Sequence, residues 1–201
     1  MIGPNYLLNV DSRHDRLASV TTEFKRVGLA FERFPAHTGE VPYLAFNSSQ
    51  YHCLLHALAA GFKYFTIYED DVRFGPYGHA ADALCQLPAD FGILQLGCNV
   101  VGSDTVEFRK PDRHSENLFR LYDCWQTQSV CYSRSCAQWI VDNWDYKTGH
   151  TYDDWLRQVY KQFKCFVVAP QLTYQDSGFS DIWGVNVDTK HLFEQGNNLL
   201  K

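Results

Sequence analysis

The chain has 201 residues, of which 45% are hydrophobic and 15% aromatic. This is enough apolar material to form the core of one domain, and it excludes an intrinsically disordered protein. The 18 Lys and Arg residues and 23 Asp and Glu residues give a formal net charge of -5. That balance excludes a globally basic protein that coats nucleic-acid phosphates, although a local basic groove stays open.

Cysteine usage and the N-terminal residues bear on the cellular compartment. The seven cysteines are odd in number, scattered and never spaced as C-x-x-C, and most stand in apolar runs. Free thiols in such settings behave as small hydrophobic residues, so the pattern predicts a reducing compartment. The first residues lack a basic segment followed by an apolar one, and no run of about 18 apolar residues occurs. The sequence therefore predicts a soluble, cytoplasmic protein without a membrane span.

Strands and helices alternate in the first half of the chain. Short apolar runs bounded by turn residues predict strands, and apolar residues spaced three and four apart predict helices. In order, we expect a strand at 6–10, a helix at 17–27, a strand at 30–34, a helix capped by Ser48 or Ser49 and ended by Gly61, a strand at 63–68, a helix at 79–87 and a strand at 91–96.

The second half is less regular. Residues 97–116 are polar and partly basic, which predicts a surface loop. After it we expect an antiparallel strand pair at 118–122 and 128–132, helices at 135–144 and 152–163, a strand at 166–169 and an irregular tail from about residue 183. No linker divides the chain. The whole pattern predicts a single α/β domain, residues 1–201, with a largely parallel sheet covered on both faces.

Three adjacent carboxylates, Glu69, Asp70 and Asp71, follow the most apolar predicted strand. Like charges at the exit of a core strand destabilise the fold unless a cation or hydrogen-bond donors offset them. If the backbone stays extended, Glu69 and Asp71 point to one side and Asp70 to the other. Hard oxygen ligands favour Mg²⁺ or Mn²⁺, with positions left open for diphosphate oxygens. The alternative is a solvated acidic turn.

A second polar cluster follows the first predicted strand. Ligands of open α/β sheets bind beyond the carboxyl ends of the strands, where Asn9 and Asp11 can contact a ribose or base and Arg13 and Arg16 can contact phosphates. The alternative is that Asp11 or Ser12 caps the following helix. Neither G-x-G-x-x-G nor a P-loop is present, which disfavours dehydrogenases and P-loop NTPases.

Two later segments carry further candidates. Asp153 and Asp154 stand at the start of a predicted helix, where the helix dipole favours acidic residues, yet either could deprotonate an acceptor hydroxyl. The polar segment 170–182 contains Gln175, Ser180 and Asp181, which have the donors and acceptors to close over a nucleotide sugar. Alone, this segment is typical of an ordinary surface loop.

Taken in order, these motifs resemble glycosyltransferase family 25, which includes lipooligosaccharide glycosyltransferases and collagen galactosyltransferases. The resemblance spans residues 5–182. It is carried by the ordered segments NVDSRHDR at 9–16, VGL at 27–29, FERFPA at 31–36, CLLH at 53–56, YEDDV at 68–72, DFGILQLG at 90–97 and QDSGFSDI at 175–182. The chain departs from the family pattern at Leu55, where Ser is usual, and at Tyr51 and His52, where Gly-Cys is more usual.

The resemblance implies a GT-A-type, Rossmann-like fold and transfer of a hexose from a nucleotide sugar, UDP-glucose or UDP-galactose, with inversion at the anomeric carbon. Mn²⁺ or Mg²⁺ would be held by Glu69 and Asp71, with Asp70 beside them in the nucleotide site. The remaining residues implied to bind the nucleotide sugar are Asn9, Asp11, Arg13, Arg16, His56, Gln175 and Ser180. For the base that activates the acceptor, Asp153, Asp154 and Asp181 are the candidates, and Asp181 could instead be a further metal ligand.

Three other functions stay open. A phage-type enzyme that glycosylates a hydroxymethylated DNA base would use the basic residues Arg109, Lys110, Arg113, His114 and Arg120 with Trp125 and Trp183. A metal-dependent phosphohydrolase could use the same acidic triplet. A non-catalytic module would bind a nucleotide or a glycan without turnover. The acceptor, whether saccharide, protein or DNA base, does not follow from the sequence.

Overall fold

A computed structural model describes residues 3–76, 78–103 and 106–201. Its centre is an eight-stranded sheet in the order β2-β1-β3-β10-β5-β11-β9-β8. The strands are β1 (Asn5–Asn9), β2 (Glu32–Pro35), β3 (Tyr64–Glu69), β5 (Phe91–Gln95), β8 (Asp112–Arg113), β9 (Leu118–Leu121), β10 (Ser129–Ser133) and β11 (Lys164–Val168). From the pairings, β9 and β10 run opposite to the other six.

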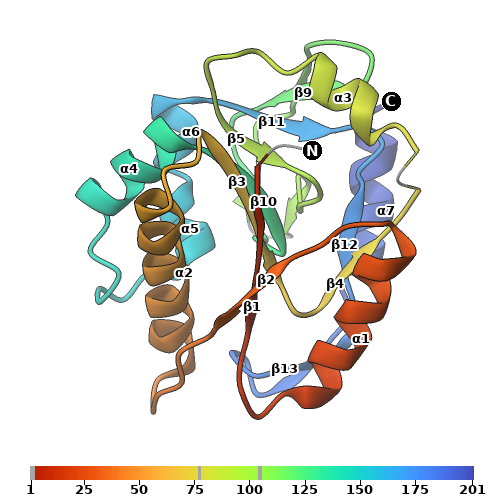
Figure 1. Cartoon of the computed structure of the whole chain (residues 1–201). Helices are drawn as coiled ribbons and strands as arrows, with labels where there is room; N and C mark the ends of the chain where they lie inside the picture. The colour runs from red at the N-terminus through yellow and green to blue at the C-terminus, as the bar shows by residue number, and fades with distance from the viewer. Residues whose placement is uncertain (1–2, 77, 104–105) are drawn as a thin grey trace.

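Three small two-stranded sheets surround the central one. They pair β4 (Val72–Phe74) with β12 (Thr173–Gln175), β6 (Gly102–Ser103) with β7 (Val106–Glu107), and β13 (Gly178–Ser180) with β14 (Val185–Val187). The β13–β14 hairpin lies near the start of α1 (His14–Arg26) in Figure 1. Residues in or next to two of these sheets, β4–β12 and β13–β14, line the cleft at the ends of β1 and β3.

Helices cover both faces of the sheet (Figure 1). One side holds α2 (Pro42–Ala59), α4 (Arg134–Asn143), α5 (Tyr152–Leu156) and α6 (Val159–Gln162), and the other holds α1, α3 (Ala80–Cys85) and α7 (Lys190–Leu199). Within the described residues no helix is both long and apolar enough to cross a lipid bilayer.

Alternation along the strands sends side chains into two separate cores. Tyr6 and Leu8 on β1 belong to the core under α2 and α4, whereas Leu7 between them packs with Val20 and Phe24 of α1. This period of two is what a strand buried on both faces requires. All seven cysteines are free thiols, and all but Cys85 are buried, as their apolar settings predicted.

The predicted α/β class is confirmed, and five local predictions are wrong. The helix expected at 152–163 is divided into α5 and α6 by a turn at 157–158. The segments at 118–122 and 128–132 do not pair, because β5 and β11 lie between β9 and β10. The second helix begins at Pro42, which is favoured in a first helical turn, and not at a Ser48 or Ser49 cap. The polar stretch 97–116 includes the short strands β6, β7 and β8. The tail after residue 183 is not irregular, since it forms β14 and then α7, whose Gly196 is buried.

Candidate functional site

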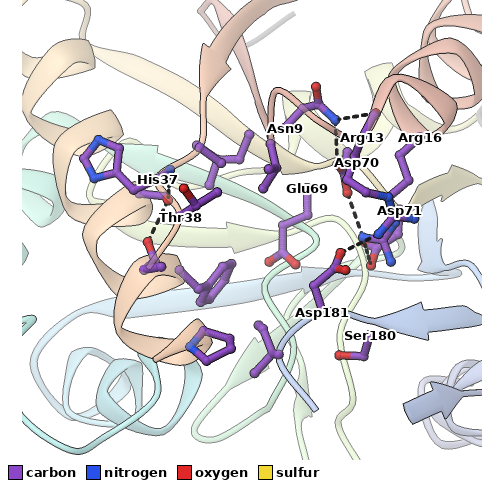
Figure 2. A pocket seen from close by; sticks show the side chains of 18 of the residues that line it. Asn9, Arg13, Arg16, His37, Thr38, Glu69, Asp70, Asp71, Ser180 and Asp181 are labelled. Atoms are coloured by element: carbon purple, nitrogen blue, oxygen red, sulfur yellow. Dashed lines mark hydrogen bonds and ion pairs between the residues drawn. The ribbon is translucent and has the colours of Figure 1, made fainter. Parts of the chain in front are cut away.

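The candidate site lies where β1 and β3 end side by side. Because the two strands are parallel neighbours, their carboxyl ends meet at one edge of the sheet, the usual ligand edge of open α/β folds. There β1 delivers Asn9 and β3 delivers Glu69. Together with the start of α1, the first turns of α2 and the turn after β13, they line a cleft of about 330 Å³ (Figure 2).

Asp70 is the fully bonded member of the acidic triplet. Asn9 Nδ2 donates to one of its carboxylate oxygens at 2.7 Å, and Arg16 Nη1 donates to the other at 2.9 Å. Arg33 Nε in turn donates to Asn9 Oδ1 at 2.9 Å. Asp70 therefore ties β1, α1 and the end of β3 together, and it fixes the positions of Asn9 and Arg16 in the cleft.

Asp71 and Glu69 are less completely satisfied. One Asp71 oxygen lies 3.5 Å from Arg16 Nη1 and accepts a 3.1 Å hydrogen bond from Gln175, whereas the other, Oδ1, is buried without a hydrogen-bond partner among the described residues. Glu69 Oε1 accepts from the Thr127 hydroxyl at 2.7 Å. Burial, and next the charge of Asp71, raise the pKa of Glu69 to about 8, and burial also raises the pKa of Asp71.

The expected geometry of the triplet requires a correction. Glu69 and Asp71 were predicted to share one side of an extended strand, with Asp70 pointing away, but β3 ends at Glu69 and the chain turns at 70–71 before β4. Figure 2 shows Glu69 in the middle of the cleft, with Asp70 and Asp71 beside Arg13 and Arg16. All three carboxylates line the same cleft.

A metal ion in this cleft would have few protein ligands. No three His, Cys, Asp or Glu side chains in the described ranges form a group that could hold a metal ion by themselves. Yet four carboxylates, those of Glu69, Asp70, Asp71 and Asp181, line the cleft against only the two guanidinium groups of Arg13 and Arg16. Because burial and the charge of Asp71 raise the pKa of Glu69 to about 8, the full surplus of two negative charges exists only when a cation takes the place of that proton. This charge and the unpartnered Asp71 oxygen fit a divalent cation that takes its other ligands from a substrate.

The two arginines also connect the start of α1 to the β13–β14 hairpin. Arg13 forms ion pairs with Asp181 and with Asp15, and Arg16 Nη2 donates to the main-chain oxygen of Phe179 at 2.6 Å. The residue before α1 is Arg13, and no side chain caps this helix. The alternative that Asp11 or Ser12 serves as its cap is therefore wrong.

Besides the acidic triplet, six of the residues predicted for nucleotide-sugar binding and catalysis line the cleft: Asn9, Arg13, Arg16, Gln175, Ser180 and Asp181. Asp11 does not. Its side chain is 80% exposed and pairs with Arg33. The position just beyond β1 turns it outward, so it does not line the cleft.

His56 is the clearest misplacement. It lies on α2 outside the cleft lining, where its Nε2 is 2.9 Å from Glu32 Oε1 and its ring contacts Tyr6 edge-on at 5.4 Å between centroids. The helical geometry explains this, because the cleft receives only the first turns of α2, through Pro42, Phe46 and neighbouring residues.

Asp153 and Asp154 stand in the first turn of α5, outside the cleft lining. Asp153 accepts hydrogen bonds from the Thr151 hydroxyl and from the amide of Asp154, and Asp154 accepts from Trp125 Nε1 at 3.0 Å. These contacts match the alternative that the two residues stabilise the start of the helix. The charge of Asp153 nevertheless contributes to the raised pKa of Glu69.

The sequence did not indicate several residues that complete the site. Arg33 reaches it from β2 and His37 lines the cleft just after that strand, while Gln126 and Thr127 come from the loop before β10. Gln126 has a φ of 74°, a region that side chains other than Gly rarely adopt, and its amide donates to Gln175 Oε1 at 3.2 Å. The only available signal was that His37 follows a strand end.

Comparisons with known proteins establish the fold. No family model matches the chain, and no curated protein matches it. Among solved structures, A197 from STIV is similar with a TM-score of 0.52 and 8% identity, over 93% of each chain. A glycosyltransferase involved in the glycosylation of the major capsid of PBCV-1 is similar with a TM-score of 0.52 and 9% identity, over 98% of this chain and all of that one. The α/β fold of the GT-A type is thereby confirmed, whereas membership of family 25 stays a prediction.

Proposed function

We propose that this protein is a glycosyltransferase that transfers a hexose from a nucleotide sugar, UDP-linked, to an acceptor hydroxyl, in the manner of family 25. The observation that carries the proposal is the junction of Asn9, Arg13 and Arg16 with Asp70 and Asp71 in one cleft at the carboxyl ends of β1 and β3. Guanidinium groups bind phosphate oxygens, and a polar side chain at a strand end suits a ribose. The fold shared with a glycosyltransferase supports the same function.

Mn²⁺ or Mg²⁺ belongs to this proposal. Asp71, with its buried unpartnered oxygen, and Glu69 would hold the ion, and the surplus of two negative charges in the cleft is what a dication offsets. When bound, the ion supplies neutralising charge for the departing diphosphate. Arg13 and Arg16, which lie beside Asp70 and Asp71, add to that neutralisation when their guanidinium groups contact phosphate oxygens.

The base we propose is Asp181. Of the three carboxylates considered, it is the one that lines the cleft, and its side chain is 51% exposed. It would accept the proton of the acceptor hydroxyl while the acceptor oxygen forms a bond to the anomeric carbon and the bond from that carbon to the diphosphate oxygen breaks. A single displacement of this kind inverts the anomeric centre. Asp153 and Asp154 already bond within their own helix start.

A donor screen tests the proposal. UDP-glucose, UDP-galactose and UDP-N-acetylglucosamine are each incubated with the protein and Mn²⁺, and UDP release is followed with and without neutral disaccharides. We expect UDP release from one hexose donor, stimulated by an acceptor and lost with a chelator. Release of inorganic phosphate instead would favour the phosphohydrolase, and UDP binding without turnover of any donor would favour the non-catalytic module.

Gln126 offers a test of how the acidic residues are positioned. Its amide holds Gln175, which donates to Asp71. Gln126→Gly keeps the positive φ without strain but removes this chain of hydrogen bonds, so we expect Mn²⁺ affinity and turnover to fall about tenfold with no loss of thermal stability. Gln126→Asn is the control for the backbone, because Asn also tolerates a positive φ. Its side chain is one methylene shorter and should not reach Gln175, so it should bind Mn²⁺ as weakly as Gln126→Gly. Unchanged Mn²⁺ binding in both variants, measured by calorimetry, would remove the positioning role.

A further inference from the structure

The β13–β14 hairpin carries an unusual concentration of exposed apolar side chains. Of the large hydrophobic residues that the structure describes, the three most exposed are Trp183 at 68%, Val185 at 55% and Phe179 at 49%. All three lie within seven consecutive residues. Exposed apolar side chains that cluster in this way often mark a binding surface, whereas single scattered ones do not.

This hairpin also forms one wall of the cleft. Ser180, Asp181 and Ile182 line it, and Trp183 is the next residue along the turn. The Trp183 amide donates to the Ser180 hydroxyl at 3.2 Å, and Asp181 is paired with Arg13, so the backbone that carries the indole is fixed to the cleft wall. Val185 is paired across the hairpin with Ser180 and thus shares its face, whereas Phe179 belongs to the opposite face.

The charges at the cleft mouth identify what this surface can accept. Asp181 lines the cleft and is paired with Arg13, and the exposed carboxylates of Asp11 and Asp15 nearby in the chain are paired with Arg33 and Arg13. With a dication bound and all four cleft carboxylates ionised, the cleft is neutral, and the diphosphate of a donor makes it negative again. A polyanion would therefore be repelled. Carboxylates accept hydrogen bonds from hydroxyl groups, and an indole face covers the C–H face of a pyranose ring.

The basic residues that would favour DNA are engaged elsewhere. They lie on or next to β8 and β9, at the end of the sheet farthest from β2. Arg109 stacks over Tyr122, Arg113 donates to the main-chain oxygen of Lys201 at 2.6 Å, and Arg120 donates to that of Phe163 at 2.9 Å. No basic groove made by these side chains adjoins the cleft.

We propose that Trp183 and Val185 form the acceptor subsite, and that the acceptor is an uncharged saccharide whose ring stacks on the Trp183 indole. This inference rests on the proposed function, since it assigns the second substrate of the same cleft. Carboxylates at the mouth would orient the sugar hydroxyl groups, and the stacked ring would bring one of them to the donor. Nucleic acid is the acceptor that this arrangement disfavours.

Trp183→Ala tests the subsite, with Phe62→Ala as the matched control. Phe62 is an aromatic residue of 43% exposure that precedes β3, at the end of the strand opposite the cleft. We expect the acceptor KM to rise about tenfold in Trp183→Ala, the equivalent of one lost stacking contact, with the donor KM unchanged. Phe62→Ala should keep both constants. Equal acceptor KM values in the two variants would overturn the assignment.

A binding measurement separates this inference from the proposed function. The indole N–H signals of the five tryptophans are recorded by NMR while lactose, cellobiose, maltose or a short DNA duplex is added in the presence of UDP and the diamagnetic ion Mg²⁺. The signal missing from the Trp183→Ala spectrum should shift with a disaccharide and not with DNA. A shift with DNA alone, or with none of these probes, overturns the subsite. UDP is titrated separately, so its failure to bind would count against the proposed function only.

Discussion

Asp71→Asn is expected to lower transfer by about three orders of magnitude while the protein stays folded. The Asp71 carboxylate lines the cleft, and its Oδ1 is buried without a hydrogen-bond partner among the described residues. Replacing this carboxylate by an amide therefore breaks no hydrogen bond at Oδ1. Removing the charge relieves repulsion with Glu69, whose raised pKa partly reflects Asp71. The melting temperature should therefore be unchanged or higher, and UDP release from the preferred donor gives the activity.

Asp176→Asn is the matched control for this variant. Asp176 lies opposite Asp71, just beyond the β4–β12 pairing: its amide donates to the Asp71 main-chain oxygen, and its carboxylate pairs with Arg73 at 2.6 Å outside the cleft lining. The same charge is removed nearby without touching the site, so turnover should stay near that of the unmodified protein. Normal turnover in Asp71→Asn, or an equal loss in both variants, would contradict the assignment of Asp71.

The free energy of unfolding of the metal-free protein should fall as the pH rises from 5 to 8. Glu69 has a folded-state pKa of about 8, against 4.5 in a model compound, because burial and Asp71 oppose its charge. Its protonation therefore favours the folded state: the contribution is fully present below pH 4.5 and is lost as the pH rises through 8. The loss is on the order of 3 kcal/mol, since one pKa unit corresponds to about 1.4 kcal/mol.

Urea denaturation at pH 5, 6, 7 and 8 measures this dependence, and Glu69→Gln is the control. The amide cannot ionise but keeps the shape and the acceptor oxygen for Thr127, so the slope should flatten. Millimolar Mn²⁺ should restore stability at pH 8 in the unmodified protein and not in Asp71→Asn. If the free energy of unfolding of the metal-free protein instead rose between pH 5 and 8, the claim that Glu69 is buried with a raised pKa would be contradicted.

Local sequence patterns predicted those helices and strands that are determined by residues close together in the sequence. The apolar run of β3 and its break at Glu69 are visible in the chain itself, as is the alternation that places β1 in the sheet. The pairing of β9 and β10 was wrong because it assumed that neighbours in sequence pair. β9 pairs with nearby β8 on one side and with distant β11 on the other, and β10 lies between β3 and β5, so the inner pairings depend on contacts between distant segments.

The same distinction holds for the site. Asn9, Arg16 and Asp70 could be predicted because they follow two parallel strands, whose ends meet at one edge. Thr127 and Gln126 could not, because only the antiparallel insertion of β10 brings the loop before that strand to the end of β3. His56 was misassigned because a motif match fixes sequence position but not which turn of α2 reaches the cleft.

The insertion of β10 also determines when in folding the site can exist. Thr127 reaches Glu69 across 58 positions of the chain, and only after β10 has joined β3. A partly assembled sheet therefore lacks the hydroxyl and amide groups that hold the two acidic side chains. A ligand that needs the completed acidic site would bind such an intermediate more weakly than the native protein, so we expect it to slow unfolding more than it speeds refolding.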